Sequence, residues 1–152
     1  MNIVIVGDGK VGAALTQQLS KEGHDITVID NNAEVLTNSM ELYDIMAVQG
    51  NGASLTVQKE ANVGSSDLVI AATSADEINL LCCILAKKLG APHTIARVRN
   101  PEYAEQLIFL KEELGLSNLY QAGLLCRWQS GDCGTAHLGQ KQAPWQTPER
   151  AI

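Results

Sequence analysis

Short apolar stretches alternate with longer amphipathic stretches over the first 121 residues of the chain. The short stretches are rich in Val, Ile and Ala, a composition that predicts β-strands. They comprise residues 2–6, 25–30, 45–48, 67–72 and 94–98, and a sixth begins near residue 118. The stretch at 67–72 is apolar without alternation, which indicates a strand that is buried on both faces of a sheet.

The longer stretches carry their apolar residues at helical spacing. They predict helices over residues 10–22, 33–42, 76–89 and 101–114, and a short helix that ends near residue 60. Gly90 and Pro92 end the helix at 76–89. Asn100 is the predicted N-cap of the last helix, because Pro101 suits a first helical turn.

Strands that alternate with helices predict an α/β fold with a doubly wound parallel sheet in the order 3-2-1-4-5-6. Ligands bind such sheets at the carboxyl ends of strands one and four. Thr73 and Ser74 follow the fourth strand and Val98 ends the fifth, so we expect these residues at that crevice. An alternative role for Ser74 is the N-cap of helix 76–89 in a capping box with Glu77, and the two roles are compatible.

A glycine motif stands where the first strand meets the first helix. Gly7, Gly9 and Gly12 form a G-x-G-x-x-G pattern, and Asp30 ends the next strand. Gly7 permits the tight turn, and Gly9 lets a pyrophosphate approach the backbone. Gly12 allows the helix to pack closely on the sheet, and the helix N-terminus offers unpaired N–H groups. This combination predicts a dinucleotide-binding site.

Asp30 indicates which dinucleotide to expect. Its carboxylate would accept hydrogen bonds from the adenosine ribose and would repel a 2′-phosphate, and Asn31 and Asn32 provide no arginine for such a phosphate. The sequence therefore predicts NAD(H), or another nucleotide with a free ribose diol, rather than NADP(H). The alternative is a glycine turn that serves packing only.

Composition limits the remaining classes of function. The 152 residues are enough for one domain, and the net charge of −6 argues against nucleic acid or an anionic membrane surface as a direct partner. No apolar run approaches the roughly 20 residues of a membrane span. Met1 leads directly into the first strand without the layout of a signal peptide, so we expect a cytoplasmic protein.

The last part of the chain has a different character. Residues 122–152 are rich in Gly, Gln and Pro, contain both tryptophans and show no helical or strand period. We therefore expect a nucleotide-binding domain over residues 1–121 and an atypical, poorly structured tail over residues 122–152.

The cysteines and histidines show no spacing typical of a metal site. Cys82 and Cys83 lie on the apolar helix at 76–89, where buried free thiols are common, and adjacent cysteines rarely form a disulfide. We expect no bound metal.

Four further segments strengthen the interpretation of the glycine motif. They are residues 48–54, 67–73, 79–90 and 95–103. Together with the motif they resemble the N-terminal nucleotide-binding lobe of the TrkA family, whose members are regulatory subunits of Trk-type potassium uptake systems. This family belongs to the wider class of domains that regulate potassium conductance. The resemblance covers about residues 1–121, and the runs at 49–54 and 95–101 are more specific than the glycine motif.

The resemblance implies a regulator and not an enzyme. Family members bind NAD(H) or adenine nucleotides such as ATP and ADP, and they assemble as dimers or rings on the cytoplasmic face of a membrane potassium-translocating subunit. The residues that correspond to the pyrophosphate site are Gly7, Asp8, Gly9, Lys10 and Val11, with Asp30 at the ribose and Thr73, Ser74 and Val98 at the rim. Lys10 would meet a terminal phosphate or remain a solvated lysine.

The resemblance stops after Tyr120. Family members continue into a crossover helix and a small ligand-binding lobe, and residues 122–152 resemble neither. Two alternatives therefore stand beside the regulator. One is a fragment of an NAD-dependent oxidoreductase, which would need a second region to place a substrate against the nicotinamide. The other is a truncated lobe without a full gating function.

Overall fold

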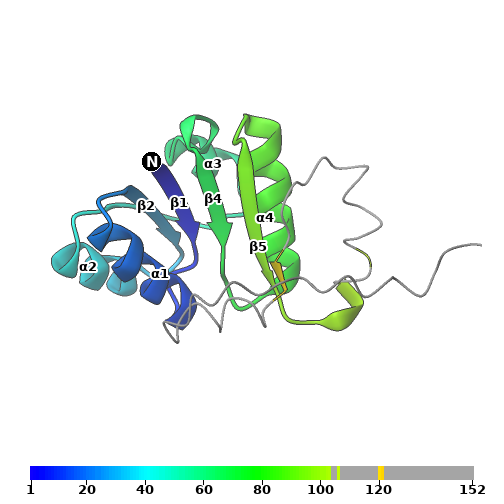
Figure 1. Ribbon diagram of the computed structural model, residues 1–152, viewed down its shortest axis with the longest axis horizontal. Coiled ribbons are helices and arrows are strands. Elements are labelled where there is room, and N and C mark those ends of the chain that lie inside the picture. The colour runs from blue at the N-terminus through cyan, green and yellow to red at the C-terminus, as the bar shows by residue number, and fades with distance from the viewer. Residues whose placement is uncertain (104–105, 107–119, 122–152) are drawn as a thin grey trace, which may run out of the picture.

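The computed structural model describes residues 1–103, 106, 120 and 121, and its strands and helices alternate as predicted (Figure 1). In chain order, the elements are β1 (Asn2–Val6), α1 (Lys10–Lys21), β2 (Asp25–Asp30), α2 (Ala33–Leu42), β3 (Met46–Gln49), α3 (Leu55–Glu60), the 3-10 helix η1 (Val63–Ser65), β4 (Leu68–Ala71), α4 (Asp76–Leu89), β5 (His93–Val98) and β6 (Tyr120–Gln121).

The strands form one parallel sheet in the order β3-β2-β1-β4-β5-β6, which confirms the predicted doubly wound fold. β1 lies in the middle, where Ile5 pairs with Val28 of β2 on one side and with Ile70 of β4 on the other. The chain passes from β3 back across β1 to β4, so the connections leave β1 in opposite directions. This reversal opens a crevice at the carboxyl ends of β1 and β4.

Helices cover both faces of the sheet, and each face has its own apolar cluster. On one face, Leu19 of α1 and Leu36 of α2 pack on Ile3, Ile5 and other strand residues. On the other face, the cluster joins α3 and α4 to strand residues such as Val69, Ala71 and Ala96. The two-sided burial explains why β4 has no polar alternation in its sequence.

Element boundaries differ slightly from those predicted. β3 begins at Met46 and not at Ile45, because the first ladder pair joins Met46 to Thr27 of β2. α1 ends at Lys21, where the C-cap residue is Glu22. Apolar periodicity locates an element, whereas hydrogen bonding decides its last residue.

The predicted end of α4 at Gly90 and the predicted N-cap at Asn100, after β5, are both confirmed. Gly90 ends α4 with a left-handed φ of 114°, and the Asn100 side chain accepts a hydrogen bond of 3.0 Å from the N–H of Glu102. Residues 101–103 are helical, as expected after an N-cap. The rest of the predicted helix at 101–114 and the tail at 122–152 lie outside the described residues.

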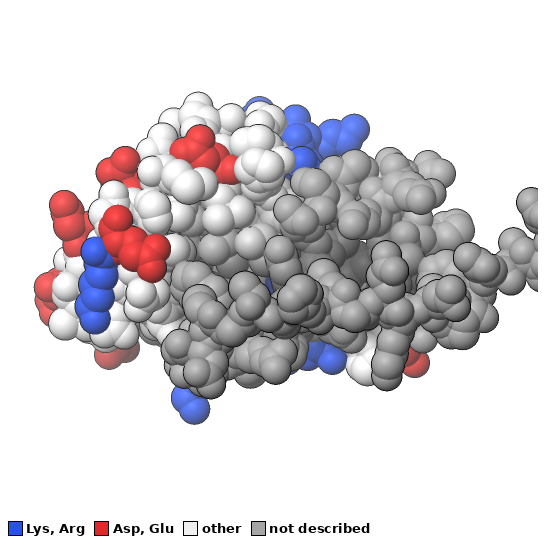
Figure 2. All heavy atoms as spheres, viewed as in Figure 1, with Lys and Arg blue, Asp and Glu red and all other residues white. Residues whose placement is uncertain are grey.

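Figure 2 shows Asp and Glu side chains gathered at the end of the molecule formed by α1 and α2, with a basic side chain among them. Basic side chains also lie near the C-terminal end of α4, where Lys87 and Lys88 occupy the last turn. Among the helices that the structure describes, none is both long enough and apolar enough to cross a membrane.

Candidate functional site

The turn between β1 and α1 depends on its three glycines in three different ways. Gly7 has a φ of +94°, and a Cβ there would lie 2.9 Å from the backbone N of Thr73. A Cβ on Gly12 would lie 1.7 Å from the carbonyl oxygen of Gly7, so α1 packs directly against the turn. Among the described residues, no atom lies within 4 Å of where a Cβ on Gly9 would stand. Gly7 and Gly12 thus serve the fold, whereas Gly9 leaves open space in front of the turn.

Asp30 lies at the carboxyl end of β2 and is attached to this turn. One of its carboxylate oxygens accepts a hydrogen bond of 2.7 Å from the N–H of Asp8, and the other accepts one of 2.8 Å from the N–H of Asn32. Each oxygen keeps a second acceptor position. The carboxylate is therefore held in place and remains able to accept hydrogen bonds from a diol.

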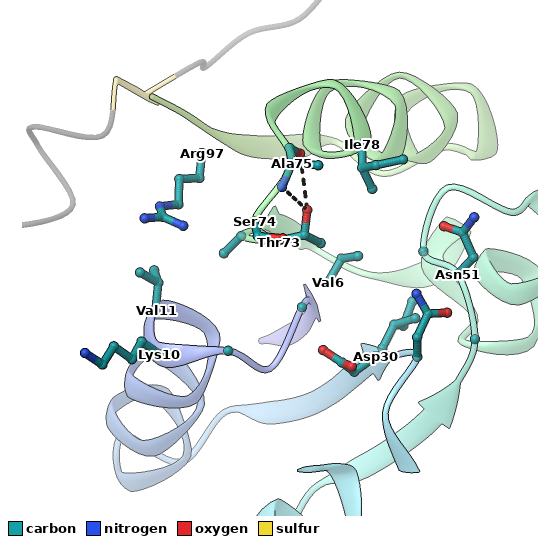
Figure 3. Close-up of a pocket in the computed structure, with 17 residues that line it drawn as sticks. Val6, Lys10, Val11, Asp30, Asn51, Thr73, Ser74, Ala75, Ile78 and Arg97 are labelled. Atoms are coloured by element: carbon teal, nitrogen blue, oxygen red, sulfur yellow. Dashed lines mark hydrogen bonds between the residues drawn. The ribbon is translucent and has the colours of Figure 1, made fainter. Parts of the chain in front are cut away.

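The turn and Asp30 open into one cleft at the carboxyl ends of the strands, with a volume of about 470 Å³ (Figure 3). Seven of the ten predicted site residues line it: Gly7, Gly9, Lys10, Val11, Asp30, Thr73 and Ser74. The further lining residues, to which the sequence analysis gave no contact with the ligand, include Gly50, Asn51, Gly52, Ala75, Ile78 and Arg97.

Asp8, Gly12 and Val98 do not line the cleft. Gly12 lies beneath the turn, as its packing role requires. The Asp8 side chain is only 3% exposed and accepts a hydrogen bond from the hydroxyl of Ser39 in α2. Burial is the main cause that raises the pKa of Asp8, and the nearby Asp30 adds to it. Asp8 thus contributes to the turn through its backbone, while its side chain joins the turn to α2.

Val98 was expected at the rim, and the structure corrects this to Arg97. Val98 is 2% exposed and belongs to the apolar cluster on the α4 face. Side chains alternate along a strand, so Arg97 follows Ile95 on the opposite face, the one covered by α1. Figure 3 shows the Arg97 side chain extending into the cleft on the same side as Lys10.

The loop after β3 is a second feature that the sequence analysis left without a site role. A Cβ on Gly52 would lie 2.1 Å from Cγ1 of Val6, so the loop approaches the end of β1 as closely as backbone allows. The Gly-Asn-Gly run at 50–52 directly follows a strand, and that position was the available signal.

The connection from β4 to α4 differs from the predicted capping box. The N-cap of α4 is Ala75, and no side chain caps the helix there. The Thr73 hydroxyl instead accepts a bond of 3.3 Å from the N–H of Ala75 (Figure 3). Glu77 accepts a hydrogen bond of 2.6 Å from the Tyr103 hydroxyl. Ser74 is exposed and lines the cleft.

The charges of the cleft are divided between its two sides. Lys10 and Arg97 lie on one side, and Asp30 lies toward the other (Figure 3). These are the only ionisable side chains among the described lining residues. The first turn of α1 adds backbone N–H groups and the positive end of its dipole. Cations, free N–H groups and a separate carboxylate suit a ligand with phosphates at one end and a ribose diol at the other.

The cysteines and acidic side chains offer no further site in the described part of the chain. Cys82 and Cys83 are free thiols with no exposed surface, and burial raises the pKa of each to about 12. Among the residues described, no three His, Cys, Asp or Glu side chains form a group that could hold a metal ion.

Comparisons with known proteins show which family this chain resembles. A protein from Methanothermobacter thermautotrophicus, a Trk system potassium uptake protein TrkA homolog, is 41% identical over 105 residues, which are 69% of this chain and 49% of that protein. The chain thus spans half or less of the length of such curated relatives, and 27% of the TrkA protein of Haemophilus influenzae.

Solved structures share the fold at lower identity. The TrkA-N domain of the inner membrane protein YbaL from Escherichia coli superposes with a TM-score of 0.70 at 18% identity, covering 85% of this chain and 93% of that one. The GsuK channel bound to NAD gives a TM-score of 0.65 at 22% identity, covering 78% of this chain and 21% of the channel chain. The family model of the TrkA-N domain matches residues 3–115. The chain therefore belongs to the TrkA-N domain family.

Proposed function

We propose that this chain is the nucleotide-binding lobe of a regulatory subunit of a Trk-type potassium uptake system. It binds NAD(H), or ATP or ADP, in the cleft between β1 and β4. It acts as a homo-oligomer on the cytoplasmic face of the plasma membrane, where it controls a membrane potassium-translocating subunit. It changes the state of that subunit through binding and catalyses no reaction of its own.

One observation carries this proposal: the glycine turn, the N-terminus of α1 and Asp30 face the same cleft in a chain of the TrkA-N family. The backbone from Gly7 to Val11 would hold the pyrophosphate, and the open space at Gly9 is where a Cβ would otherwise stand. Asp30 would accept the ribose hydroxyls, and Thr73 and Ser74 would contact the rest of the ligand.

The ionisable groups of the cleft support binding. Lys10 and Arg97 provide positive charge for phosphates, and Asp30 provides the one carboxylate of the described lining. A hydride transfer would need in addition an acid or base and a substrate pocket beside the nicotinamide. A regulator needs only a different affinity for each nucleotide in two states of the assembly.

The names of related proteins support the potassium system and the class of ligand. The relatives at 37% to 41% identity are named Trk system potassium uptake proteins. Neighbours in fold include the GsuK channel bound to NAD and GsuK bound to ADP. The chain spans half or less of the length of those relatives, so their names alone do not assign it a partner subunit or an oligomeric assembly, and both are proposed here.

Calorimetric titration of the full chain with NADH, NAD⁺, NADPH, ATP and ADP tests the binding step. We expect NADH to bind more tightly than NADPH, since Asp30 accepts a free diol and repels a 2′-phosphate. Equal affinity for NADPH would overturn the role of Asp30. A folded chain that binds none of the five nucleotides would overturn the proposal.

Two further measurements test the regulatory role. Light scattering should give a mass above that of one 16.3 kDa chain. Co-purification from membranes should recover a Trk-type potassium-translocating subunit with the tagged chain, and Gly9→Val should change potassium uptake by cells that carry both. Uptake that is the same with and without the chain would contradict a regulatory role.

A further inference from the structure

A buried amide lies directly behind the cleft. Asn79, in α4, has no exposed surface, yet every hydrogen-bonding group of its side chain has a partner. Its Oδ1 accepts bonds of 2.8 Å from the N–H of Thr73 and 2.7 Å from the Thr73 hydroxyl. Its Nδ2 donates bonds of 3.2 Å to the Thr73 carbonyl and 2.8 Å to the Arg97 carbonyl. The amide therefore joins two residues that both line the cleft.

These bonds begin where the sheet ladder stops. The register between β4 and β5 ends with the pair Ala71 and Ala96, and Thr73 and Arg97 lie beyond that pair. Arg97 instead pairs with Tyr120 of β6. No ladder pair joins the two strand ends on the cleft side, and side chains make the connection instead. Asn79 joins Thr73 to Arg97, and farther from the ladder the Asp76 carboxylate accepts hydrogen bonds from the N–H groups of Arg99 and Asn100.

Thr73, which Asn79 holds, also packs against the glycine turn. A Cβ on Gly7 would approach the Thr73 backbone N and Cα at 2.9 and 3.0 Å, so the turn and Thr73 are in close contact. The hydroxyl bond to Asn79 also sets the χ1 rotamer of Thr73. Asn79 thus positions Thr73 against the glycine turn, and through its bond to the Arg97 carbonyl it positions the backbone that carries the Arg97 side chain.

We propose that Asn79 is the positioning residue of the nucleotide site, which holds Thr73 and Arg97 in the arrangement that the phosphates of the ligand require. This role rests on the proposed function, because it presumes a nucleotide in the cleft. Asn79 itself touches no ligand: it acts through the backbone and hydroxyl of Thr73 and through the backbone of Arg97.

The test separates positioning from stability. Asn79→Ala removes all four bonds, and Val63→Ala is the control, because Val63 is a fully buried core residue in η1, before β4, and does not line the cleft. Affinities for NADH and ADP are measured by calorimetry with the full chain, at a temperature where each variant is folded by circular dichroism. We expect Asn79→Ala to lose about tenfold or more in affinity, the scale of one hydrogen bond to a charged group, and Val63→Ala to bind as the wild type does.

A double-mutant cycle with Arg97→Ala identifies the route of the effect. If Asn79 acts through Arg97, the double variant Asn79→Ala/Arg97→Ala loses less affinity than the product of the two single losses. The pair Val63→Ala and Arg97→Ala should give independent effects. Equal affinity of Asn79→Ala and the wild type, or full independence of Asn79 and Arg97, would overturn the positioning role while leaving nucleotide binding intact.

A second variant covers the case in which Asn79→Ala does not fold. Asn79→Ser keeps a polar, uncharged side chain on α4, and this side chain is too short to join Thr73 to the Arg97 carbonyl, so we expect it to fold and to bind nucleotide more weakly. Failure of both variants to fold would overturn the proposal in favour of a purely structural residue. Absence of binding by the wild-type chain would instead overturn the proposed function, and the positioning role with it.

Discussion

The carboxylate of Asp30 accepts a hydrogen bond of 2.7 Å from the backbone N–H of Asp8. This bond joins the end of β2 to the glycine turn after β1, two segments 22 residues apart in sequence. One carboxylate therefore shapes the turn and faces the cleft at the same time. A substitution at Asp30 therefore changes both the shape of the turn and the groups that face the cleft.

Asp30→Ala should weaken NADH binding by about 1.5–3 kcal/mol, the usual range for hydrogen bonds to a charged group. Calorimetry measures the loss. Asp25→Ala is the matched control, because Asp25 begins the same strand at the far end and is exposed. Asp30→Asn keeps an acceptor for the Asp8 N–H and loses the one for the Asn32 N–H, so it retains the bond to the turn while removing the negative charge that faces the cleft. Unchanged affinity in Asp30→Ala would remove Asp30 from the site.

Gly9→Val should abolish nucleotide binding without lowering the melting temperature. In the described part of the chain the new Cβ would meet no atom within 4 Å, and the φ of Gly9 is −74°, so we expect the side chain to displace the ligand and to leave the fold unchanged. Gly12→Ala should instead lower the melting temperature, because its Cβ would lie 1.7 Å from the Gly7 carbonyl oxygen and α1 would have to move. Thermal unfolding and titration of both variants check the pair. Binding that survives in a folded Gly9→Val would place the ligand elsewhere.

Arg97→Ala should lower the affinity for ADP and NADH and make the remaining binding less sensitive to salt. The guanidinium lies in the cleft with Lys10, and interactions between such partly solvated charges are screened by ions. Titration at two ionic strengths measures both effects, and Lys88→Ala is the control, because Lys88 is exposed near the C-terminal end of α4. An Arg97 variant that binds ADP as the wild type does, with the same salt dependence, would contradict a phosphate contact.

Asp8→Asn should stabilise the fold at neutral pH. Burial raises the pKa of Asp8 in the folded chain, so the charged form is disfavoured there and stability falls as the pH rises through that pKa. The amide has no charge to bury and still accepts a bond from Ser39. The gain in melting temperature of Asp8→Asn over the wild type should therefore shrink as the pH falls below the Asp8 pKa. A gain that is constant from pH 4 to pH 8, or a loss at neutral pH, would contradict the effect of burial.

Cys82 and Cys83 should resist alkylation in the native chain. Burial raises both thiol pKa values to about 12, so at pH 8 neither residue offers a thiolate, and neither has exposed surface. Peptide mapping after iodoacetamide treatment should find both unlabelled in the native chain and labelled after denaturation. Rapid native labelling at either position would show that α4 opens readily.

The sequence alone determined the order of the elements and the doubly wound fold, and it predicted the glycine turn of Gly7, Gly9 and Gly12 with Asp30 beside it. The reason is that each depends on local chemistry: apolar period distinguishes strands from helices, and a glycine before a helix permits a turn that other residues resist. A parallel sheet of this order then has its crevice in one place, so residues that end β1, β2 and β4 meet there.

Only the tertiary structure decided that Arg97 and not Val98 enters the cleft, that Ala75 and not Ser74 is the N-cap of α4, and that Asn79 joins Thr73 to Arg97. The face of β5 that turns toward α1 is set by its pairing with β4 and its packing against α4. A buried amide finds its partners only when two strand ends from different parts of the chain are brought to one helix. These features arise from contacts distant in sequence, which no local pattern specifies.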